Sequence, residues 1–183
     1  MKKLFVILIV IILAIPAFAQ NQPAVSVDKN VLKINTLSLF LGTGSIFYER
    51  KLNDMSSAMM GVGYLSFKFG DTKFSGLILT PEYRIYVKKN AIDGFYVAPY
   101  LRYQNYTLKN DAEAAKGSLN IMGGGFAFGR QWITDSGFTM DLFFGGHYGS
   151  GNLSVDTGSA SSFDTDKFNG FKTRMGFALG FSF

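Results

Sequence analysis

The chain has 183 residues, with 18 Lys and Arg, 13 Asp and Glu, one His, no Cys and a formal net charge of +5. This length supports one domain, and the missing cysteine excludes a disulfide scaffold, thiolate zinc sites and a cysteine nucleophile, so no cofactor is expected. Only 17% of the residues are charged while 16% are aromatic, a composition too apolar for a disordered chain and too aromatic for a helical bundle.

Residues 1–19 are predicted to be a cleaved signal peptide. Lys2 and Lys3 precede an apolar run at 4–15, and Pro-Ala-Phe-Ala at 16–19 supplies the small-x-small pattern that signal peptidase cuts. The apolar run is shorter than the roughly 20 residues of a membrane-spanning helix. Cleavage would leave 16 basic and 13 acidic residues, a charge of +3. This modest charge, in an exported protein, argues against nucleic acid as a partner.

The remainder is predicted to be a polar periplasmic lead-in at 20–30, followed by one β-barrel domain at 31–183. No helical period appears over a useful length, and apolar and polar residues alternate with period two instead. The last strand is the clearest case, with Phe171, Met175 and Phe183 on one face and Lys172 and Arg174 on the other. Eight strands are expected, at 31–41, 45–53, 57–69, 75–88, 94–107, 118–133, 137–149 and 170–183.

The lengths of the connections favour an antiparallel up-and-down barrel in a membrane. Tight turns are expected after the second, fourth and sixth strands, and longer loops at 109–117 and 150–169 after the fifth and seventh. Transmembrane barrels have short turns on the periplasmic rim and longer loops outside the cell. The short connection after the first strand is the exception.

A soluble lipocalin-like barrel is the alternative to a membrane barrel, because its strands alternate as well. The polar faces here carry mainly Gly, Ala and Ser with isolated charges, which suits a narrow eight-strand interior better than a solvated exterior. The apolar faces carry Phe and Tyr near the strand ends, as in the aromatic girdles of membrane barrels. The apolar faces are therefore expected to face lipid, which makes outer-membrane lipid the main partner.

Six charged residues are predicted by parity to form an ion network inside the barrel. A charge in a dry lumen is costly unless it is paired. The candidates are Glu49, Glu82, Arg84, Arg102, Asp141 and Arg174. Glu82 and Arg102 are expected to be near-diagonal neighbours if Val87 opposes Phe95. A structural role is expected, with no open pore and no catalytic site.

For the sixth strand, the sequence does not determine whether the even or the odd positions face lipid. If its even positions face lipid, Phe126, Phe128 and Trp132 are well placed but Arg130 is exposed to lipid. If they face inward, Arg130 can oppose Asp141 but two phenylalanines crowd the lumen. A β-bulge near Gly129 is the favoured interpretation, because glycine accommodates the extra residue.

The C-terminal stretch MGFALGFSF at 175–183 resembles the terminal signature of bacterial outer-membrane barrels. The resemblance implies that Phe177, Leu179, Phe181 and Phe183 form the signal read by the barrel-assembly machinery. The wider pattern resembles small barrel families of unknown function in Bacteroidota, through LKINT at 32–36, FYER at 47–50, YVAPYLR at 96–102 and GRQW at 129–132. This implies an OmpA-like transmembrane barrel without a periplasmic domain.

The expected function is that of a non-enzymatic, monomeric outer-membrane protein that serves envelope structure or surface interaction through its loops. One alternative is a lipopolysaccharide-modifying enzyme built on His147 and Ser150. That reading is weakened because His147 is expected to point inward, whereas a lipid hydrolase needs its nucleophile and base on the lipid side. Another alternative is a carrier of small apolar molecules, with Tyr96, Tyr100, Tyr106 and Phe143 lining a pocket.

Overall fold

Strand-forming alternation runs through the whole described chain, and the strands close into a ring. The computed structural model describes residues 28–40, 42–69, 72–88, 90–110, 115–158 and 169–183. The predicted signal peptide and most of the lead-in lie outside these residues. The elements are β1 (Asn30–Asn35), α2 (Thr36–Phe40), β2 (Thr43–Asn53), β3 (Ser56–Phe69), β4 (Thr72–Tyr86), β5 (Gly94–Asn110), β6 (Ala115–Ile133), β7 (Phe138–Thr157) and β8 (Gly170–Ser182).

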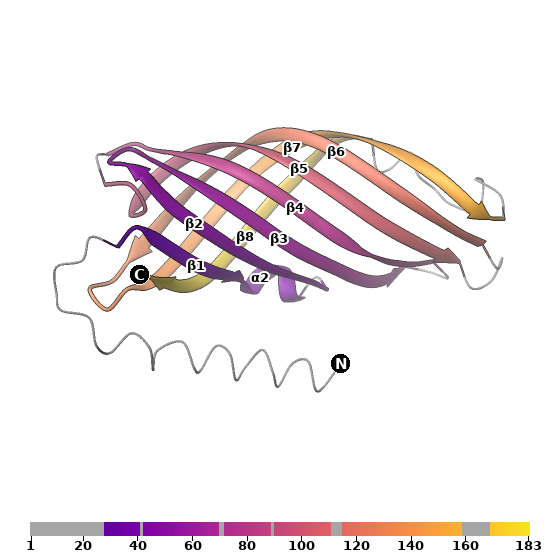
Figure 1. Cartoon of the computed structure of the whole chain (residues 1–183), viewed down its shortest axis with the longest axis horizontal. Helices are drawn as coiled ribbons and strands as arrows, with labels where there is room; N and C mark the ends of the chain where they lie inside the picture. Colours follow the sequence, from indigo (N-terminus) through magenta and orange to yellow (C-terminus); the bar gives the residue numbers. More distant parts are fainter. Residues whose placement is uncertain (1–27, 41, 70–71, 89, 111–114, 159–168) are drawn as a thin grey trace.

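The eight strands form a closed antiparallel up-and-down barrel (Figure 1). Each strand pairs with its neighbours in sequence, and β1 pairs with β8 from Val31↔Ser182 to Asn35↔Ala178, which completes the ring. The connections after β2, β4 and β6 lie at the same end as the C terminus. The predicted all-β, eight-stranded fold is confirmed. None of the described helices is long and apolar enough to cross a membrane.

Several strand boundaries differ from the expected ones. The first strand was expected at 31–41 but ends at Asn35, and α2 takes the place of its second half. The seventh strand was expected to end at 149 but continues to Thr157, so much of the expected loop at 150–169 is strand. Residues 159–168 lie outside the described part. The barrel is consequently longer on the side of β3–β7 than predicted, as Figure 1 shows.

In the half of the barrel nearer the C terminus, which we call the lower half, the outer face is mainly apolar, whereas the inner face carries charged, polar and small residues together with Phe47, Met59 and Phe143. On β4, Tyr83 and Ile85 are exposed on the outer face whereas Glu82 and Arg84 are buried inside. The outward apolar side chains form a band around the barrel, which we call the apolar band. Its exposed members include Met60, Val62, Tyr64, Leu77, Tyr83, Ile85, Val87, Phe95, Leu101, Tyr103, Met122, Phe126, Phe128, Leu142, Phe144, Tyr148, Phe171 and Met175.

The pattern reverses in the part of β3–β7 farthest from the C terminus, which we call the extension. Its inward side chains form an apolar cluster made by Leu65, Phe74, Ile78, Tyr106, Leu108, Ala115, Leu119, Ile121, Leu153 and Val155. Its outward side chains are polar: Ser66, Lys68, Lys73, Ser75, Asn105, Thr107, Lys109, Lys116, Ser118, Asn120, Ser150, Asn152, Ser154 and Asp156. The outer face of one continuous sheet is therefore apolar in the apolar band and polar in the extension, as expected for a surface that passes from lipid into water.

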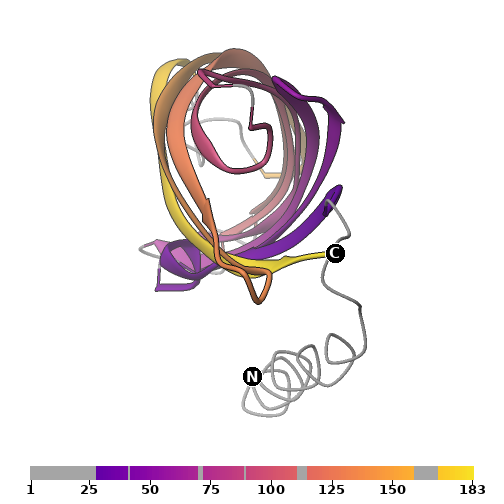
Figure 2. The same cartoon turned by 90° about the vertical axis from the view of Figure 1, so that its left-hand side faces the viewer.

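The connection between β4 and β5 folds into the mouth of the barrel at the C-terminal end (Figure 2). Ala91 and Ile92 are only 2% and 5% exposed. The backbone N–H of Ala91 donates to the carbonyl of Asp54 at 2.9 Å, and the side chain of Gln131 donates to the carbonyl of Ile92 at 2.7 Å. This segment lies inside the mouth and is anchored to the neighbouring β2–β3 turn and to β6.

The expected bulge near Gly129 is absent, and that interpretation was wrong. Gly129 stays in register with Tyr96 on β5 and Phe143 on β7, and even positions of β6 face outward. Arg130 therefore lies on the outer face. Its guanidinium stacks on the rings of Phe95 at 4.7 Å and Trp132 at 5.0 Å. The two rings cover the guanidinium of Arg130 on the outer face, so this facing needs no bulge.

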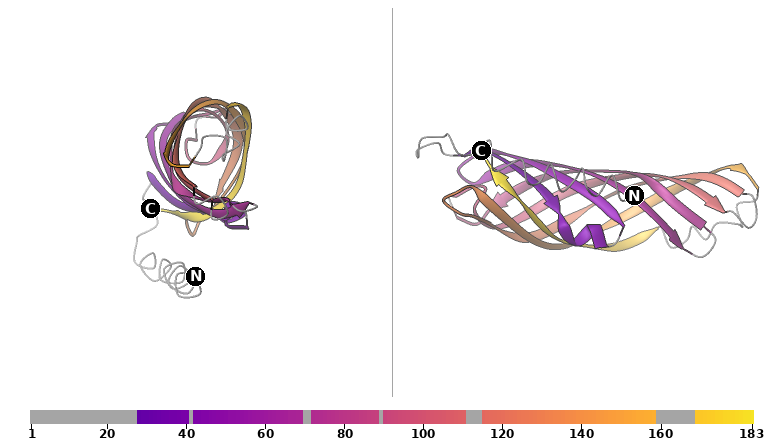
Figure 3. Two further views of the ribbon diagram at one scale, coloured as in Figure 1. Left: turned by 90° about the vertical axis from the view of Figure 1, so that its right-hand side faces the viewer. Right: turned by 90° about the horizontal axis from the view of Figure 1, so that it is seen from below.

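The wall between β8 and β2 is made differently from the rest. β1 pairs with β2 only as far as Ile34↔Ile46, and beyond Asn35 the short helix α2 packs on both β2 and β8 (Figure 3). The hydroxyl of Thr36 donates to the carbonyl of Phe177 at 2.8 Å. β8 continues past this point, paired with β7, as far as Gly170. In the described residues, the upper half of β8 therefore has a strand partner on one side only.

Candidate functional site: a charged lumen network and a basic cavity

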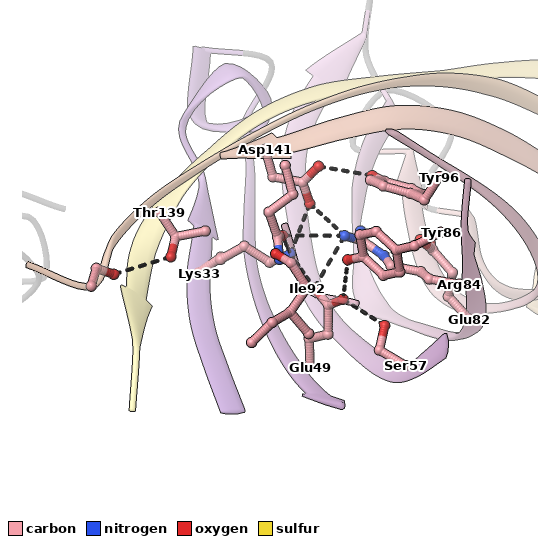
Figure 4. Close-up of polar contacts among 12 residues, drawn as sticks. Lys33, Glu49, Ser57, Glu82, Arg84, Tyr86, Ile92, Tyr96, Thr139 and Asp141 are labelled. Carbon is pink, nitrogen blue, oxygen red and sulfur yellow. Dashed lines mark hydrogen bonds and ion pairs between the residues drawn. The ribbon is translucent and has the colours of Figure 1, made fainter. Parts of the chain in front are cut away.

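Two cations and two carboxylates from four strands meet at the centre of the lower lumen (Figure 4). Lys33 Nζ of β1 lies 2.6 Å from Glu49 Oε2 of β2 and 2.8 Å from Asp141 Oδ2 of β7. Arg84 Nη1 of β4 contacts the same two oxygens at 3.1 and 2.8 Å. Gln131 accepts hydrogen bonds from both cations. All five side chains are fully buried, so each carboxylate is held by two positive charges.

Hydroxyl groups donate hydrogen bonds to the other oxygen of each of the two carboxylates. Ser57 and Tyr86 both donate to Glu49 Oε1 at 2.6 Å, and Tyr96 donates to Asp141 Oδ1 at 2.8 Å. The Tyr96 ring also lies under the Arg84 guanidinium, 4.1 Å away. Buried polar groups are costly when unpaired, and these donors leave no carboxylate oxygen of Glu49 or Asp141 without a partner.

Glu82 extends the network upward. Its Oε1 accepts from Arg84 Nε at 2.8 Å and its Oε2 from Arg174 Nη1 of β8 at 2.7 Å. The Arg174 guanidinium lies over the rings of Tyr100 and Phe143 at 4.6 and 4.7 Å. The network now contains three cations and three carboxylates, so its formal charge is zero.

Five of the six predicted network residues lie in this cluster, and Arg102 lies apart from it. Arg102 makes one long contact, 3.4 Å from Nη1 to the Thr80 hydroxyl, and its Nε has no partner. The register does place Val87 opposite Phe95, but Glu82 bonds Arg84 and Arg174 instead of Arg102. Within the described residues, Arg102 pairs with no carboxylate.

Sequence reasoning missed several members of the network: Lys33, Ser57, Tyr86, Tyr96 and Gln131. Alternation supplied a signal for Lys33, because it stands between the outward residues Leu32 and Ile34. Gln131 was not predicted because the sequence did not determine which face of the sixth strand points inward. Once even positions are known to face outward, Gln131 must point inward.

Arg102 faces a cavity of about 350 Å³ above the network. Basic groups of the lining are Arg102, Lys172 and Arg174, and no Asp or Glu belongs to the described lining. His147 and Gln104 complete the polar part of the wall. The lining also includes Thr43 and Ser45 of β2 and Thr173 and Met175 of β8, so the cavity lies beside the place where α2 takes the position of β1 between these two strands.

The strands do not bring together His147 and Ser150, the two residues of the alternative hydrolytic site. His147 is 5% exposed and faces the lumen, where Nδ1 lies 3.1 Å from the Tyr100 hydroxyl. Ser150 is exposed on the outer face of the same strand, so the wall of the barrel separates the two. The described residues contain no group of acidic, His or Cys side chains that would hold a metal ion.

The predicted assembly signal lies on the outer face of β8. Leu179 pairs with Ile34 and Phe181 with Leu32 at the seam that closes the barrel. Phe183 is 56% exposed at the end of the chain, and its carbonyl accepts from the backbone N–H of Asn30 at 3.0 Å. Its role in assembly stays a prediction.

Comparisons with known proteins complete the description of the chain. The crystal structure of CarO from Acinetobacter baumannii is similar in fold, with a TM-score of 0.49 and 12% sequence identity over 88% of this chain and 100% of that one. No curated protein matches the sequence. A family described as a protein of unknown function, DUF3575, matches residues 5–152, and the chain belongs to this family.

Proposed function

We propose that the protein is an integral outer-membrane β-barrel without enzymatic activity, serving envelope structure or surface contacts through its extension. The observation that carries this proposal is the reversal of polarity along β3–β7. Outward Tyr148 of β7 is followed by Ser150 and Asn152 on the same face, while the inward face changes from His147 to Leu153. A soluble barrel has no physical reason to reverse its exterior in mid-strand, whereas a barrel leaving a bilayer does.

The height of the apolar band fits the hydrocarbon core of an outer membrane. On β4 the outward apolar residues run from Leu77 to Val87, and on β7 from Phe138 to Tyr148. Ten residues at about 3.3 Å each, tilted by about 40°, give a band about 25 Å tall. Tyr64, Tyr103 and Tyr148 lie at its upper edge, where interfacial aromatic side chains are favoured.

Where the strands pair on both sides, the ring satisfies the backbone without water, which is the condition for crossing hydrocarbon. Between β2 and the upper half of β8, the helix α2 takes the place of a strand. The charged network fills the part of the lumen nearer the C terminus, and the β4–β5 connection folds into the mouth at that end, as expected for a barrel of eight strands. These features support a structural or surface role rather than an open pore. The separation of His147 from Ser150 by the barrel wall supports the absence of lipid hydrolysis. A monomer, assembled by the barrel-assembly machinery, belongs to the same proposal.

Cysteine labelling on cells tests both the location and the orientation, because the chain has no cysteine. Ser154 is exposed on the outer face of the extension and Ser136 is exposed in the β6–β7 turn. In intact cells, a membrane-impermeant maleimide is expected to label Ser154→Cys and not Ser136→Cys. After the outer membrane is permeabilised, both should react.

The unsubstituted protein is the control and should take no label. Labelling of both variants in intact cells would contradict the proposed orientation. If neither variant is labelled until the inner membrane is broken, the protein is not in the outer membrane.

A further inference from the structure

Among the described residues, Arg102 is the cation of the cavity wall that stands outside the balanced network and for which the structure gives no carboxylate partner. The three carboxylates Glu49, Glu82 and Asp141 are matched by Lys33, Arg84 and Arg174. Arg102 is additional to this set, and its Nε has no partner. Because a cation in a low-dielectric lumen is costly without a counter-charge, the cavity in front of Arg102 is suited to an anion.

Two further buried groups in the cavity wall have unused hydrogen-bonding atoms. His147 is 5% exposed and Gln104 is 8% exposed, and His147 Nε2 and Gln104 Oε1 have no partner. With Tyr100 as donor to His147 Nδ1, Nε2 carries the hydrogen and becomes a donor toward the cavity. Gln104 Oε1 can accept a hydrogen bond from a hydroxyl group of a ligand. The cavity thus offers a guanidinium and an imidazole for an anionic group and one acceptor for a neighbouring hydroxyl.

The position of the cavity in the barrel indicates from which side such a ligand would enter. Below the cavity lies the charge-balanced network, and above it, in the described residues, lies the apolar cluster that includes Ile78 and Tyr106. The cavity borders the wall between β2 and β8, and its lining includes Met175, which is 54% exposed and belongs to the apolar band. Leu37 and Phe40 of α2, the helix that packs on both strands, are exposed as well, and Phe40 is 88% exposed. An apolar chain at this place would lie in lipid.

We propose that the cavity binds the anionic head group of a membrane amphiphile, with Arg102 and His147 contacting the anion and the acyl chain leaving between β2 and β8 beside α2. This inference rests on the proposed membrane location. It assigns to the barrel a ligand of defined chemistry: one carboxylate or phosphate group, an adjoining hydroxyl and a hydrocarbon tail.

Photolabelling in vesicles tests the assignment. The full-length mature barrel is reconstituted in phosphatidylcholine vesicles with dodecyl phosphate that carries a diazirine near the end of its chain, and labelled residues are mapped by mass spectrometry. Labels are expected to concentrate at Leu37, Phe40 and Met175. Diazirine-labelled dodecanol, which lacks the charge, is expected to label the apolar band all round, including Phe126 and Phe144.

Matched variants separate the anion site from general lipid contact. Arg102→Gln is expected to lower labelling at Met175 by the phosphate probe about tenfold, the loss of one charge-assisted contact. Arg130→Gln removes the same charge at the outer face near the opposite rim and should leave it unchanged. Should Arg102→Gln fail to fold, judged by heat-dependent migration on a gel, His147→Leu supplies the same comparison.

Each other outcome has a definite meaning. Even labelling of the band by the phosphate probe, or equal effects of Arg102→Gln and Arg130→Gln, would overturn the inference. So would inorganic phosphate competing as well as unlabelled dodecyl phosphate, since the ligand would then be a soluble anion. Failure of the dodecanol probe to label the band would instead contradict the membrane location itself.

Discussion

Lys33 links the strand that closes the barrel to its surroundings by side-chain contacts. β1 has six residues and is the shortest strand, yet it must join β8 to β2. Lys33 lies in its middle and reaches across the lumen to Glu49 and Asp141. The network therefore ties the weakest strand to β2 and β7 by side chains, in addition to its few backbone hydrogen bonds.

Removing one carboxylate of the network is expected to destabilise the barrel strongly. In Glu49→Gln, Lys33 and Arg84 lose a shared counter-charge while remaining fully buried. Breaking a buried ion pair on one side costs about 3–5 kcal/mol. The free energy of unfolding, measured by urea titration of the refolded barrel, should fall by about that amount.

Asp54→Asn is the matched control for Glu49→Gln. Asp54 pairs with Lys51 at 3.1 Å, but its side chain is 78% exposed, so the expected change is within about 0.5 kcal/mol. Equal losses in the two variants would show that the lumen network does not hold the barrel together.

Single residues were predictable from sequence where the strand parity was clear, and not elsewhere. Glu82 and Arg84 stand in an unbroken alternation on β4, so their inward direction follows directly. Arg130 breaks the alternation of β6, and its stacking on Phe95 and Trp132 depends on cross-strand and same-face neighbours. Partners across the lumen, such as those of Arg102, depend on the shear of the closed barrel, which no local pattern contains.

Among the elements, β6 is a strand whose inner face is approached closely by its neighbours. It carries glycine at the inward positions 123, 125 and 129. A Cβ at Gly129 would collide with the ring and hydroxyl of Tyr96. That hydroxyl donates to Asp141, so the glycine on β6 sets the position of a network donor on β5.

Gly129→Ala is expected to lower the stability of the barrel by about 1–3 kcal/mol, because Tyr96 must move away from Asp141. Gly44→Ala is the comparison, since no atom lies within 4 Å of a Cβ placed there. Heat-dependent gel migration over a temperature series measures both. An identical melting point for the two variants would contradict the close packing of Tyr96 on Gly129.

The helix α2 illustrates why short elements escape sequence reasoning. Thr36–Phe40 reads TLSLF, which alternates polar and apolar residues as a strand does. The helix is formed because Asn35 Oδ1 accepts from the backbone N–H of Ser38 at 3.3 Å and the Ser38 hydroxyl bonds back to the carbonyl of Asn35 at 2.9 Å. Such local side-chain bonds compete with strand pairing.

A cross-link tests the position of α2. The hydroxyl oxygens of Ser38 and Ser45 of β2 lie 3.5 Å apart, within reach of a disulfide if both become cysteine. Ser38→Cys with Ser45→Cys should form this bond on mild oxidation of the folded barrel, detected by mass spectrometry. Ser38→Cys with Ser136→Cys, a residue of the turn at the opposite end, should not. Absence of the first cross-link would mean that α2 does not pack on β2.

At the scale of the whole molecule, the fold class was predictable but the length of the barrel was not. The expected ends of the fifth and seventh strands, at 107 and 149, fall close to the level where polarity reverses. Gln104 and Asn105 are both polar although one faces in and the other out, so the alternation fades there while the strand continues. The expectation that apolar side chains always face outward holds only within the apolar band.

The reversal of polarity along β7 is the claim on which the membrane location depends, and single-tryptophan fluorescence tests it most directly. The chain has one tryptophan, Trp132, which can be replaced by Phe. A new tryptophan is then placed at Phe144 or at Asn152, two outward positions of the same strand, in vesicles containing bromine-labelled lipid tails. A barrel that leaves the bilayer between these positions should show strong quenching at 144 and almost none at 152. Equal quenching at both positions, or none at 144, would contradict it.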